Sequence, residues 1–434
     1  MPKTELIEKI VNKSAKVGVI GLGYVGLPFA VESAKAGFNV TGIDKSQDKV
    51  DNVNNTINYI SDVLDDDLKS VIQNKKLVAT TSFEICAELD IIIICVPTPL
   101  TKNLMPDINY IIDSTQEIAK YLHEGQLVSL ESTTYPGTTE EVMLPILEKS
   151  GLKVESDFFL AHSPERVDPG NHQFKTKNTN KVVGGVGPES LEVALAFYSQ
   201  TIDTVVPVSS AKAAELVKVF ENTFRAVNIA VVNELALYCD RININVWEVL
   251  DAAFTKPFGI MPFYPGPGVG GHCIPLDPHY LEWKAKEVNF TTRFINLAGE
   301  INRSMPEFVR NKVWRVLNEI GVAPSRARIL VIGVTYKKDV GDYRESPALD
   351  ILKMLKKDGA NITYHDPYVP RFIENGIELE SVELTKAYLS QQDMILILTN
   401  HSNIDYNWLV NNSKVVLDTR NACKGIKSDK IRLL

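Results

Sequence analysis

Cysteine is rare in this chain of 434 residues, and its five cysteines form no closely spaced pair. The cysteines are odd in number, widely spaced and without a CxxC motif, which argues against both a disulfide framework and a structural zinc site. We therefore expect no metal site, and thiols that stay reduced, as in the cytoplasm. Cys86, Cys95 and Cys239 lie in apolar helix or strand patterns and are interpreted as small core residues.

Long hydrophobic runs and an excess of basic charge are also missing. The apolar run 91–96 is far too short to span a bilayer. The N-terminal segment has mixed charge and no apolar stretch typical of a signal peptide, so we expect a cytoplasmic protein with no membrane partner. Lys and Arg number 46 against 54 Asp and Glu, a net charge of -8, which argues against a nucleic-acid-binding surface.

The chain does contain two series of apolar, β-branched runs separated by helical patterns. Such runs predict parallel sheets covered by helices on both faces, so the expected fold class is α/β with two Rossmann-like doubly wound domains. The predicted strands of the first series are 16–21, 39–44, 91–96, 127–130 and 157–161, and those of the second are 328–334, 360–366, 393–399 and 414–419.

Between the two series lies a long apolar-periodic stretch, from Ala211 to about Tyr238, that contains neither proline nor glycine. Ser209 and Ser210 are candidate N-caps for this helix. A helix of this length between two α/β units is expected to link domains, and its wide apolar face suggests a dimer contact.

A GxGxxG motif, Gly21-Leu22-Gly23-Tyr24-Val25-Gly26, stands where the first predicted strand meets the first predicted helix. The three glycines allow a tight turn, approach of the backbone to a pyrophosphate, and close packing of helix on strand. Asp44 follows at the end of the next strand, about 20 residues on, where an acid binds ribose hydroxyls. Asp44 favours NAD, whereas the neighbouring Lys45 leaves NADP open; the alternative is a glycine turn that serves packing alone.

The second α/β unit keeps only Gly333 at the corresponding turn, so it is not expected to hold a dinucleotide in the same way. Its loop carries Lys337, Lys338 and Arg344, which would suit the pyrophosphate of another ligand. The alternative interpretation is a solvated basic loop.

Cys273 differs from the other cysteines, because it lies in the Gly/Pro-rich segment 257–278 with His272 and Asp277 close by. It is a candidate nucleophile; the alternatives are a buried thiol in a glycine turn, or a metal ligand together with His272, Asp277 and His279. Lys218 and Asn222 are four residues apart and share one face of the long helix.

Two further groups of polar residues directly follow predicted strands. Glu165 and Arg166 follow one strand, and Thr133 follows another. The carboxyl edge of a parallel sheet is where α/β proteins bind ligands, so these residues are candidates for the same site.

Taken with these residues, the chain resembles the UDP-glucose/GDP-mannose dehydrogenase family from Lys16 to its end. The matching motifs are GLGYVGLP, VPTP (96–99), STTYPGTT (132–139), SPERV (163–167), Lys218 with Asn222, GPGVGGHCIPLDP (266–278) and YKKDVGDYRESP (336–347). The resemblance implies an NAD-binding domain (1–206), a central helical dimerisation domain (207–310) and a UDP-binding domain (311–434). It also implies a UDP-sugar substrate, NAD as cofactor, a homodimer or higher homo-oligomer, and a role in surface polysaccharide synthesis (capsule or O-antigen).

The reaction implied by the resemblance is a four-electron oxidation of the sugar C6 alcohol to a carboxylate, through a thiohemiacetal and a thioester on Cys273. Lys218 and Asn222 would stabilise oxygen atoms in that pocket, Asp277 would orient water or relay protons, Thr133 would hold water, and Glu165 would assist hydrolysis. The residues implied at the cofactor are Gly21, Gly23, Tyr24, Val25, Gly26, Asp44, Lys45, Pro97, Thr98, Thr133 and Arg344. Those implied at the substrate are Glu165, Arg166, Val167, Lys218, Asn222, Tyr264, Gly266, Gly268, Gly270, His272, Tyr336 and Lys337.

Two departures bear on which sugar is oxidised. The UDP-glucose branch has a lysine where this chain has Leu276, and an arginine upstream of the cysteine where this chain offers only Lys256. The segment GGHCIP looks most like the UDP-N-acetylglucosamine 6-dehydrogenase branch, which we therefore expect. UDP-glucose and UDP-N-acetylmannosamine remain alternative substrates, and a β-hydroxyacid dehydrogenase or an NAD-binding regulatory module is a more distant alternative.

Overall fold

The computed structural model describes residues 2–60, 62–101, 105–168, 171, 173–271, 274–374 and 376–434. His272 and Cys273 therefore lie outside the described residues. The fold divides into two compact units, one formed by Met1–Glu221 with His279–Phe290, the other by Asn222–Pro278 with Thr291–Leu434. The division into three domains at residues 206 and 310 stays a prediction.

The first unit is built on an eight-stranded sheet, counted over the described residues, with the order β3-β2-β1-β4-β5-β6-β7-β8. Neighbouring strands are parallel except for the antiparallel pair β6–β7. The chain leaves β1 toward β2 and β3 and later returns to place β4 on the other side, so the order reverses between β1 and β4. The strands are β1 (Lys16–Ile20), β2 (Asn39–Ile43), β3 (Leu77–Thr80), β4 (Ile91–Ile94), β5 (Leu127–Leu130), β6 (Phe159–His162), β7 (Lys181–Gly185) and β8 (Val205–Val208).

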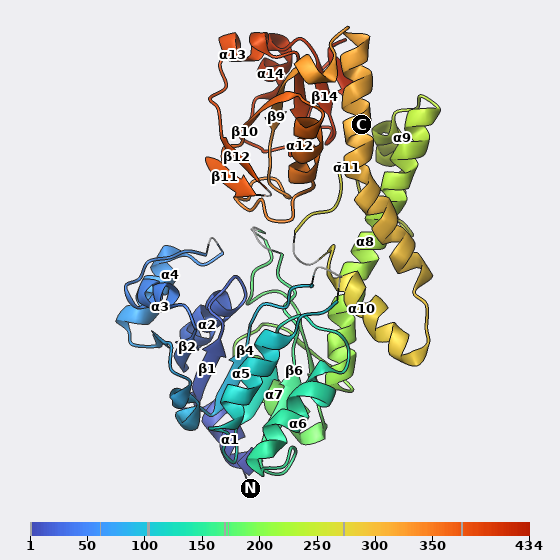
Figure 1. Ribbon diagram of the computed structural model, residues 1–434. Coiled ribbons are helices and arrows are strands. Elements are labelled where there is room, and N and C mark those ends of the chain that lie inside the picture. The colour runs from blue at the N-terminus through green and yellow to red at the C-terminus, as the bar shows by residue number, and fades with distance from the viewer. Residues whose placement is uncertain are drawn as a thin grey trace. The chain divides into compact units, whose positions relative to one another are not determined.

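Helices cover both faces of this sheet, as the sequence predicts (Figure 1). One apolar core joins the sheet to α1, α2, α3, α4 and α7, and another joins it to α5 and α6. The helices are α1 (Pro2–Val11), α2 (Gly26–Lys35), α3 (Gln47–Asn54), α4 (Asp65–Gln73), η1 (Phe83–Glu88), α5 (Asn109–Ala119), a π-helical segment η2 (Thr138–Met143), α6 (Leu144–Leu147), η3 (Glu148–Ser150), α7 (Pro188–Tyr198), α10 (Asp277–Ala285) and η4 (Lys286–Val288).

The second unit contains a five-stranded parallel sheet, again counted over the described residues, with the order β10-β9-β13-β14-β15. Its order reverses between β9 and β13, and a separate hairpin β11–β12 stands beside it. Helices α11 and α12 pack on one core and α13 and α14 on the other. The elements are α9 (Val246–Ala253), α11 (Arg293–Glu319), η5 (Pro324–Arg326), β9 (Arg328–Ile332), α12 (Pro347–Lys357), β10 (Asn361–His365), β11 (Arg371–Glu374), β12 (Ile377–Glu380), α13 (Lys386–Gln391), β13 (Met394–Ile397), α14 (Tyr406–Asn412), β14 (Val416–Asp418) and β15 (Ile431–Leu433).

The long central helix is α8, Ala211–Arg241, and it carries the chain from the first unit into the second. The Ser210 hydroxyl accepts a hydrogen bond from the Ala213 N–H at 3.1 Å, which confirms Ser210 as an N-cap. The C-terminal half of α8 packs on α9 through an apolar core that includes Ala236 and Trp247.

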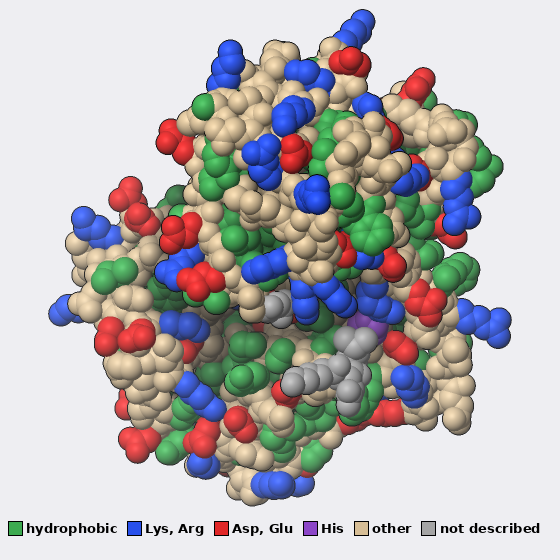
Figure 2. All heavy atoms as spheres, turned by 45° about the horizontal axis from the view of Figure 1, so that its top comes forward, with side chains coloured by type: hydrophobic (Ala, Val, Ile, Leu, Met, Phe, Trp, Pro, Cys, Tyr) green, Lys and Arg blue, Asp and Glu red, His purple; other side chains and the backbone are tan. Residues whose placement is uncertain are grey.

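On the face drawn in Figure 2, Lys and Arg side chains are interspersed with Asp and Glu side chains, and hydrophobic side chains are exposed among them. Over the described part of the chain, no helix is both long enough and apolar enough to cross a membrane.

Candidate functional site

The glycine turn between β1 and α2 has the geometry that a dinucleotide requires. Gly21 has a φ of 92°, and a Cβ there would lie 2.4 Å from the Cys95 carbonyl oxygen. A Cβ on Gly26 would lie 1.8 Å from the Gly21 oxygen, whereas a Cβ on Gly23 would meet nothing within 4 Å. Gly21 and Gly26 therefore close the turn, and Gly23 presents bare backbone to open space at the start of α2. An anion such as a pyrophosphate can approach there.

Asp44 stands beside this turn, at the end of β2. Its carboxylate accepts hydrogen bonds from the Leu22 N–H at 2.8 Å and the Ser46 N–H at 3.0 Å, and it pairs with Lys49 at 3.0 Å. Lys45 instead pairs with Asp113, at 3.4 Å. The carboxylate and the glycine turn lie next to each other, so these residues fit an NAD molecule, with the ribose at Asp44 and the pyrophosphate at the turn.

The loops that carry Pro97, Thr98 and Thr133 leave the neighbouring strands β4 and β5. The Ser132 hydroxyl donates to the Val96 carbonyl at 2.7 Å and so joins the two loops. Tyr280 of α10 donates its hydroxyl hydrogen to the Thr98 carbonyl. The three predicted residues therefore lie at one edge of the sheet, the edge that carries the glycine turn.

Behind this edge two buried charged side chains, Lys181 and Glu131, meet the partly buried Glu165. Lys181 Nζ lies 3.0 Å from a Glu131 oxygen and 3.3 Å from a Glu165 oxygen, and the Lys181 side chain is only 4% exposed. The Lys181 ammonium also lies over the rings of Phe29 and Tyr198, 5.4 and 5.6 Å from their centroids. Lys181 and Glu131 were missed by the sequence analysis, because neither a charged residue that begins a strand, as Lys181 does, nor one that follows a strand, as Glu131 does, gives a local signal that it will be buried.

The pKa values of the two carboxylates are shifted in opposite directions. Burial would raise the pKa of Glu165, but Lys181, the backbone N–H groups of Val167 and Arg166, and Lys218 outweigh it and hold the pKa below its usual value. Burial raises the pKa of Glu131 to about 7, despite the nearby lysine. Glu165 is therefore the ionised carboxylate of the pair at neutral pH, ready to accept a proton.

Arg166 and Val167 help to position Glu165 through the backbone. Both donate their N–H groups to one Glu165 oxygen at 2.7 Å. The Arg166 guanidinium pairs with Glu221 of α8 at 2.5 Å and donates to the Asn180 carbonyl at 2.6 Å. Its side chain is thus engaged with α8, while its backbone holds the candidate base.

Helix α8 is attached to the loop that follows β5 by Glu215. Its carboxylate accepts from the N–H of Gly137 at 2.5 Å and from the N–H and hydroxyl of Thr139 at 2.8 and 2.7 Å. Burial raises the pKa of Glu215 to about 7. Lys218, one turn further along α8, is 9% exposed and acts electrostatically on Glu165.

The second unit brings together another part of the predicted site. The Asn222 amide donates to the Asp277 carboxylate at 2.5 Å, and both side chains are buried. Gly266 donates its N–H to Asn233 at 3.1 Å. Asn222 and Asp277, assigned to one pocket on the resemblance alone, thus lie in contact.

The glycine-rich loop packs closely against the C-terminal sheet. A Cβ on Gly270 would lie 2.7 Å from the Cβ of Tyr336, and a Cβ on Gly268 would lie 2.9 Å from Pro347. A Cβ on Gly266 would lie 2.5 Å from a guanidinium nitrogen of Arg420. The loop that leads to Cys273 therefore touches the expected nucleotide residue Tyr336, and a side chain at Gly268 or Gly270 would clash with the residues packed against it.

Arg420 is a third residue that the sequence analysis missed. It follows β14, donates Nε–H to the Leu398 carbonyl at 2.9 Å, and has its pKa lowered by burial to about 10, so it stays protonated at neutral pH. The available signal was its position directly after a predicted strand, next to Asp418. A cation beside the glycine loop can attract a phosphate.

Other predicted residues have partners of their own. The Tyr264 hydroxyl donates to Asp251 at 2.9 Å, and its ring stacks on Trp247. Arg344 pairs with Asp342 at 2.7 Å. Among the described residues, no three His, Cys, Asp or Glu side chains are placed to hold a metal ion. The roles of His272 and Cys273 stay predictions, because these residues lie outside the described ranges.

Comparison with known proteins gives consistent matches along the chain. Three models of the UDP-glucose/GDP-mannose dehydrogenase family match: the NAD binding domain at residues 15–202, the central domain at 212–304 and the UDP binding domain at 330–425.

The individual relatives carry two different names. The chain is 35% identical over 419 residues to a UDP-N-acetyl-D-mannosamine dehydrogenase of Methanococcus maripaludis, covering 94% of this chain and 92% of that protein. It is 36% identical over 359 residues to a UDP-N-acetyl-D-glucosamine 6-dehydrogenase of Pseudomonas aeruginosa, covering 82% and 84%. The solved structure of a UDP-D-ManNAc dehydrogenase from Pyrococcus horikoshii superposes with a TM-score of 0.88 at 32% identity, covering 96% of this chain and 98% of that one.

Proposed function

The chain belongs to the UDP-glucose/GDP-mannose dehydrogenase family and is an NAD-dependent UDP-sugar dehydrogenase, and we propose that its substrate is a UDP-N-acetylhexosamine, UDP-N-acetylglucosamine first. The observation that carries this choice is Leu276. It is partly buried and directly precedes Asp277, which is fixed by Asn222. An apolar side chain here cannot bond a sugar hydroxyl, and it leaves room beside the ring for an acetamido group.

The reaction oxidises the C6 alcohol to a carboxylate with one water, and three protons are released overall. NAD+ held by the Gly21–Gly26 turn and Asp44 would supply the hydride acceptor for the two oxidation steps. Cys273 adds to the C6 aldehyde as a thiolate; loss of the second hydride leaves a thioester, and water releases the carboxylate and the free thiol. Lys218 stabilises the oxyanion, and Glu165 takes a proton from the attacking water.

The Asn222–Asp277 contact supports the roles of both residues. The Asn222 amide nitrogen is held by the carboxylate, so its carbonyl oxygen and second N–H have a fixed direction. Such preorganised dipoles stabilise charge without reorganising during the reaction. Asp277 at the start of α10 then relays protons or orients water beside the substrate.

Initial rates of NADH formation with a panel of UDP-sugars test the proposed substrate. We expect kcat/KM for UDP-N-acetylglucosamine to exceed that for UDP-glucose by roughly 10- to 200-fold. The second candidate is UDP-N-acetylmannosamine, which the names of two of the relatives above favour. If UDP-glucose has the highest kcat/KM, the acetamido-sugar proposal fails. The Leu276→Lys variant should raise the relative rate with UDP-glucose if this position selects the sugar, and Leu276→Met, which keeps an apolar side chain there, is the control.

We also propose that the enzyme is a homodimer formed through α8, working in the cytoplasm in the synthesis of surface polysaccharide. Phe220, Val231 and Tyr238 on α8 are 60%, 59% and 59% exposed and lie near whole numbers of helical turns from one another, so they form one stripe. Burying such a stripe against a second copy removes apolar surface from water. Light scattering of Val231→Glu should give the monomer mass, and an unchanged mass would contradict this contact.

A further inference from the structure

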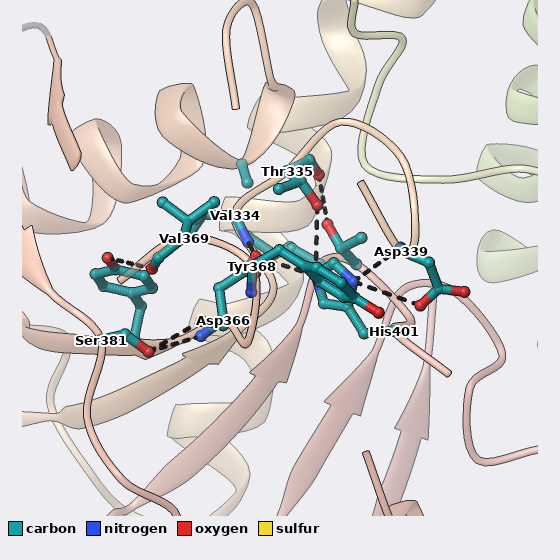
Figure 3. Close-up of polar contacts among 12 residues, drawn as sticks. Val334, Thr335, Asp339, Asp366, Tyr368, Val369, Ser381 and His401 are labelled. Atoms are coloured by element: carbon teal, nitrogen blue, oxygen red, sulfur yellow. Dashed lines mark hydrogen bonds and ion pairs between the residues drawn. The ribbon is translucent and has the colours of Figure 1, made fainter. Parts of the chain in front are cut away.

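The function proposed above gives no role to a buried histidine and aspartate in the second unit. The side chains of His401 and Asp366 are both 0% exposed, and His401 Nε2 lies 3.0 Å from Asp366 Oδ2. Asp366 directly follows β10, and His401 follows β13. Both therefore lie at the carboxyl edge of the sheet, close to the point where its strand order reverses (Figure 3).

The partners of the His401 ring determine its tautomer. Nδ1 lies 3.0 Å from the backbone nitrogen of Asp339, which can only donate, so Nδ1 accepts and carries no hydrogen. The hydrogen of the neutral ring is therefore on Nε2 and is donated to the Asp366 carboxylate. The Thr335 hydroxyl, 3.4 Å from Nε2, donates its own hydrogen to the Lys337 carbonyl at 2.9 Å. The imidazole thus connects two separate partners.

These two partners hold the two ends of one short segment. Asp366 Oδ2 also accepts from the Val334 N–H at 2.8 Å, directly after β9, and His401 accepts from Asp339, which has a φ of 60°. The Asp339 carboxylate is itself fixed by the N–H and hydroxyl of Ser402 at 2.7 and 2.6 Å. The segment Val334–Asp339 is therefore attached at both ends to the His401–Asp366 pair (Figure 3).

The first unit also has an aspartate that accepts the N–H of the residue after a glycine turn, but that aspartate has different surroundings. There the Leu22 N–H donates to Asp44 just as the Val334 N–H donates to Asp366, each directly after a glycine with positive φ. Asp44 faces Lys49, whose side chain is 41% exposed. Asp366 is enclosed and bonded to a buried ring, so it is not available to the hydroxyl groups of a ribose.

We propose that His401 and Asp366 are positioning residues that hold the segment Val334–Asp339 in the conformation that receives the diphosphate of the UDP-sugar. Between the two attachment points lie Tyr336 and Lys337, the residues expected at the nucleotide. The inference rests on the proposed function in that it places the uridine diphosphate at this loop. Loss of the imidazole would leave a buried carboxylate and the Asp339 N–H each short of a partner, so the segment would lose its fixed shape.

Titration calorimetry of the full-length protein with UDP, and separately with NAD+, tests the proposal. We expect His401→Ala to weaken UDP binding by about 10-fold or more while the affinity for NAD+ is unchanged. His401→Gln should recover part of the loss, because its amide can both donate and accept. The control Thr385→Ala removes the N-cap bond of α13, 3.1 Å from the Tyr388 nitrogen, and should leave UDP affinity unchanged. Unchanged UDP affinity in a folded His401→Ala protein overturns the proposal, as does an equal loss in the control.

If His401→Ala does not fold, amide hydrogen exchange measured on His401→Gln tests the proposal instead. The Asp339 amide should exchange faster than in the wild type, and unchanged exchange together with unchanged UDP affinity overturns the proposal. The outcomes separate this inference from the choice of substrate. If the wild type binds UDP but does not oxidise UDP-N-acetylhexosamines, only the proposed function fails; if it oxidises them and His401→Ala binds UDP normally, only the positioning role fails.

Discussion

Replacing Lys181 by methionine should move the acidic limb of the pH profile to higher pH. Among the groups that oppose burial and hold the pKa of Glu165 below its usual value, Lys181 has the largest effect, and its ammonium lies 3.3 Å from that carboxylate. Without the cation the pKa of Glu165 rises. A base is inactive once protonated, so activity is then lost at a higher pH as the solution is acidified.

The size of the shift follows from the distance. Two unit charges 3.3 Å apart interact by about 5 kcal/mol at an effective dielectric constant of ~20, which is an upper bound. Opposite charges this close usually move a carboxyl pKa by about 1–3 units. The backbone donors of Arg166 and Val167 remain in Lys181→Met, so we expect a shift in the lower half of that range.

The companion carboxylate provides a control. The pKa of Glu131 is about 7, so this side chain is already protonated at the acidic pH where Glu165 titrates, and Glu131→Gln should leave the acidic limb unchanged. Lys181→Met leaves Glu131 buried without its cation, and the loss of one partner from a buried pair typically costs about 3–5 kcal/mol of stability. The double variant Lys181→Met/Glu131→Gln removes both charges and should recover part of this loss.

The assay is kcat/KM between about pH 3 and 9, followed by NADH absorbance, with a thermal melt of each variant; the range extends below pH 5 because the wild-type pKa of Glu165 lies below its usual value. Because kcat/KM reports the pKa values of the free enzyme, its acidic limb reads the ionisation of Glu165 directly. An acidic limb of folded Lys181→Met that coincides with that of the wild type would refute the electrostatic coupling described here.

Three further predictions concern the thiol, the glycine turn and acid stability. Cys273→Ser should bind NAD+ and UDP-sugar but lose about 10³-fold or more in kcat, whereas Cys95→Ala should keep kcat; near-normal NADH formation by Cys273→Ser would contradict its role as nucleophile. Gly23→Ala should fold normally and bind NAD+ more weakly in calorimetry. In Gly26→Ala the new Cβ would lie 1.8 Å from a backbone oxygen of the turn, so this variant should have a lower melting temperature. Burial lowers the pKa of His162 to about 3, so this ring stays neutral in the folded state, whereas in the unfolded state it takes up a proton below pH ~6.5. Between pH 7 and 5 the unfolding free energy of the wild type, measured by urea unfolding, should therefore fall by about 2 kcal/mol more than that of His162→Gln. Equal losses would show that this ring does not titrate on unfolding.

The elements that the sequence predicted best are those defined by local signals. Helix α12, Pro347–Lys357, shows such signals, because Ser346 caps it and proline occupies its first position. Helix α8 begins at Ala211, directly after its Ser210 cap, and ends three residues beyond the predicted Tyr238. The strand predicted at 157–161 is shifted to Phe159–His162, since an apolar run marks a strand but not its ends.

The residues that were missed depend on contacts between distant parts of the chain. Lys181 meets Glu131 only because β5, β6 and β7 are neighbours in the sheet, and nothing near either residue in sequence indicates the pair. Helix α11 was not predicted at all; it contains Pro306, which locally suggests a break and which the fold buries. The glycine turn and Asp44 could be predicted because both belong to a motif of fixed spacing.

The attachment of Glu215 has a consequence for motion. At the turn that opens the π-helical segment η2, where Gly137 has a φ of 106°, the N–H groups of Gly137 and Thr139 donate to the Glu215 carboxylate on α8. A loop held in this way cannot fluctuate independently of the helix on the nanosecond timescale usual for surface loops. We therefore expect correlated motion of Thr133, at the base of this loop, and Lys218, one turn along α8 from Glu215. Thermal motion should change the distance between these two residues much less than it changes the position of either one.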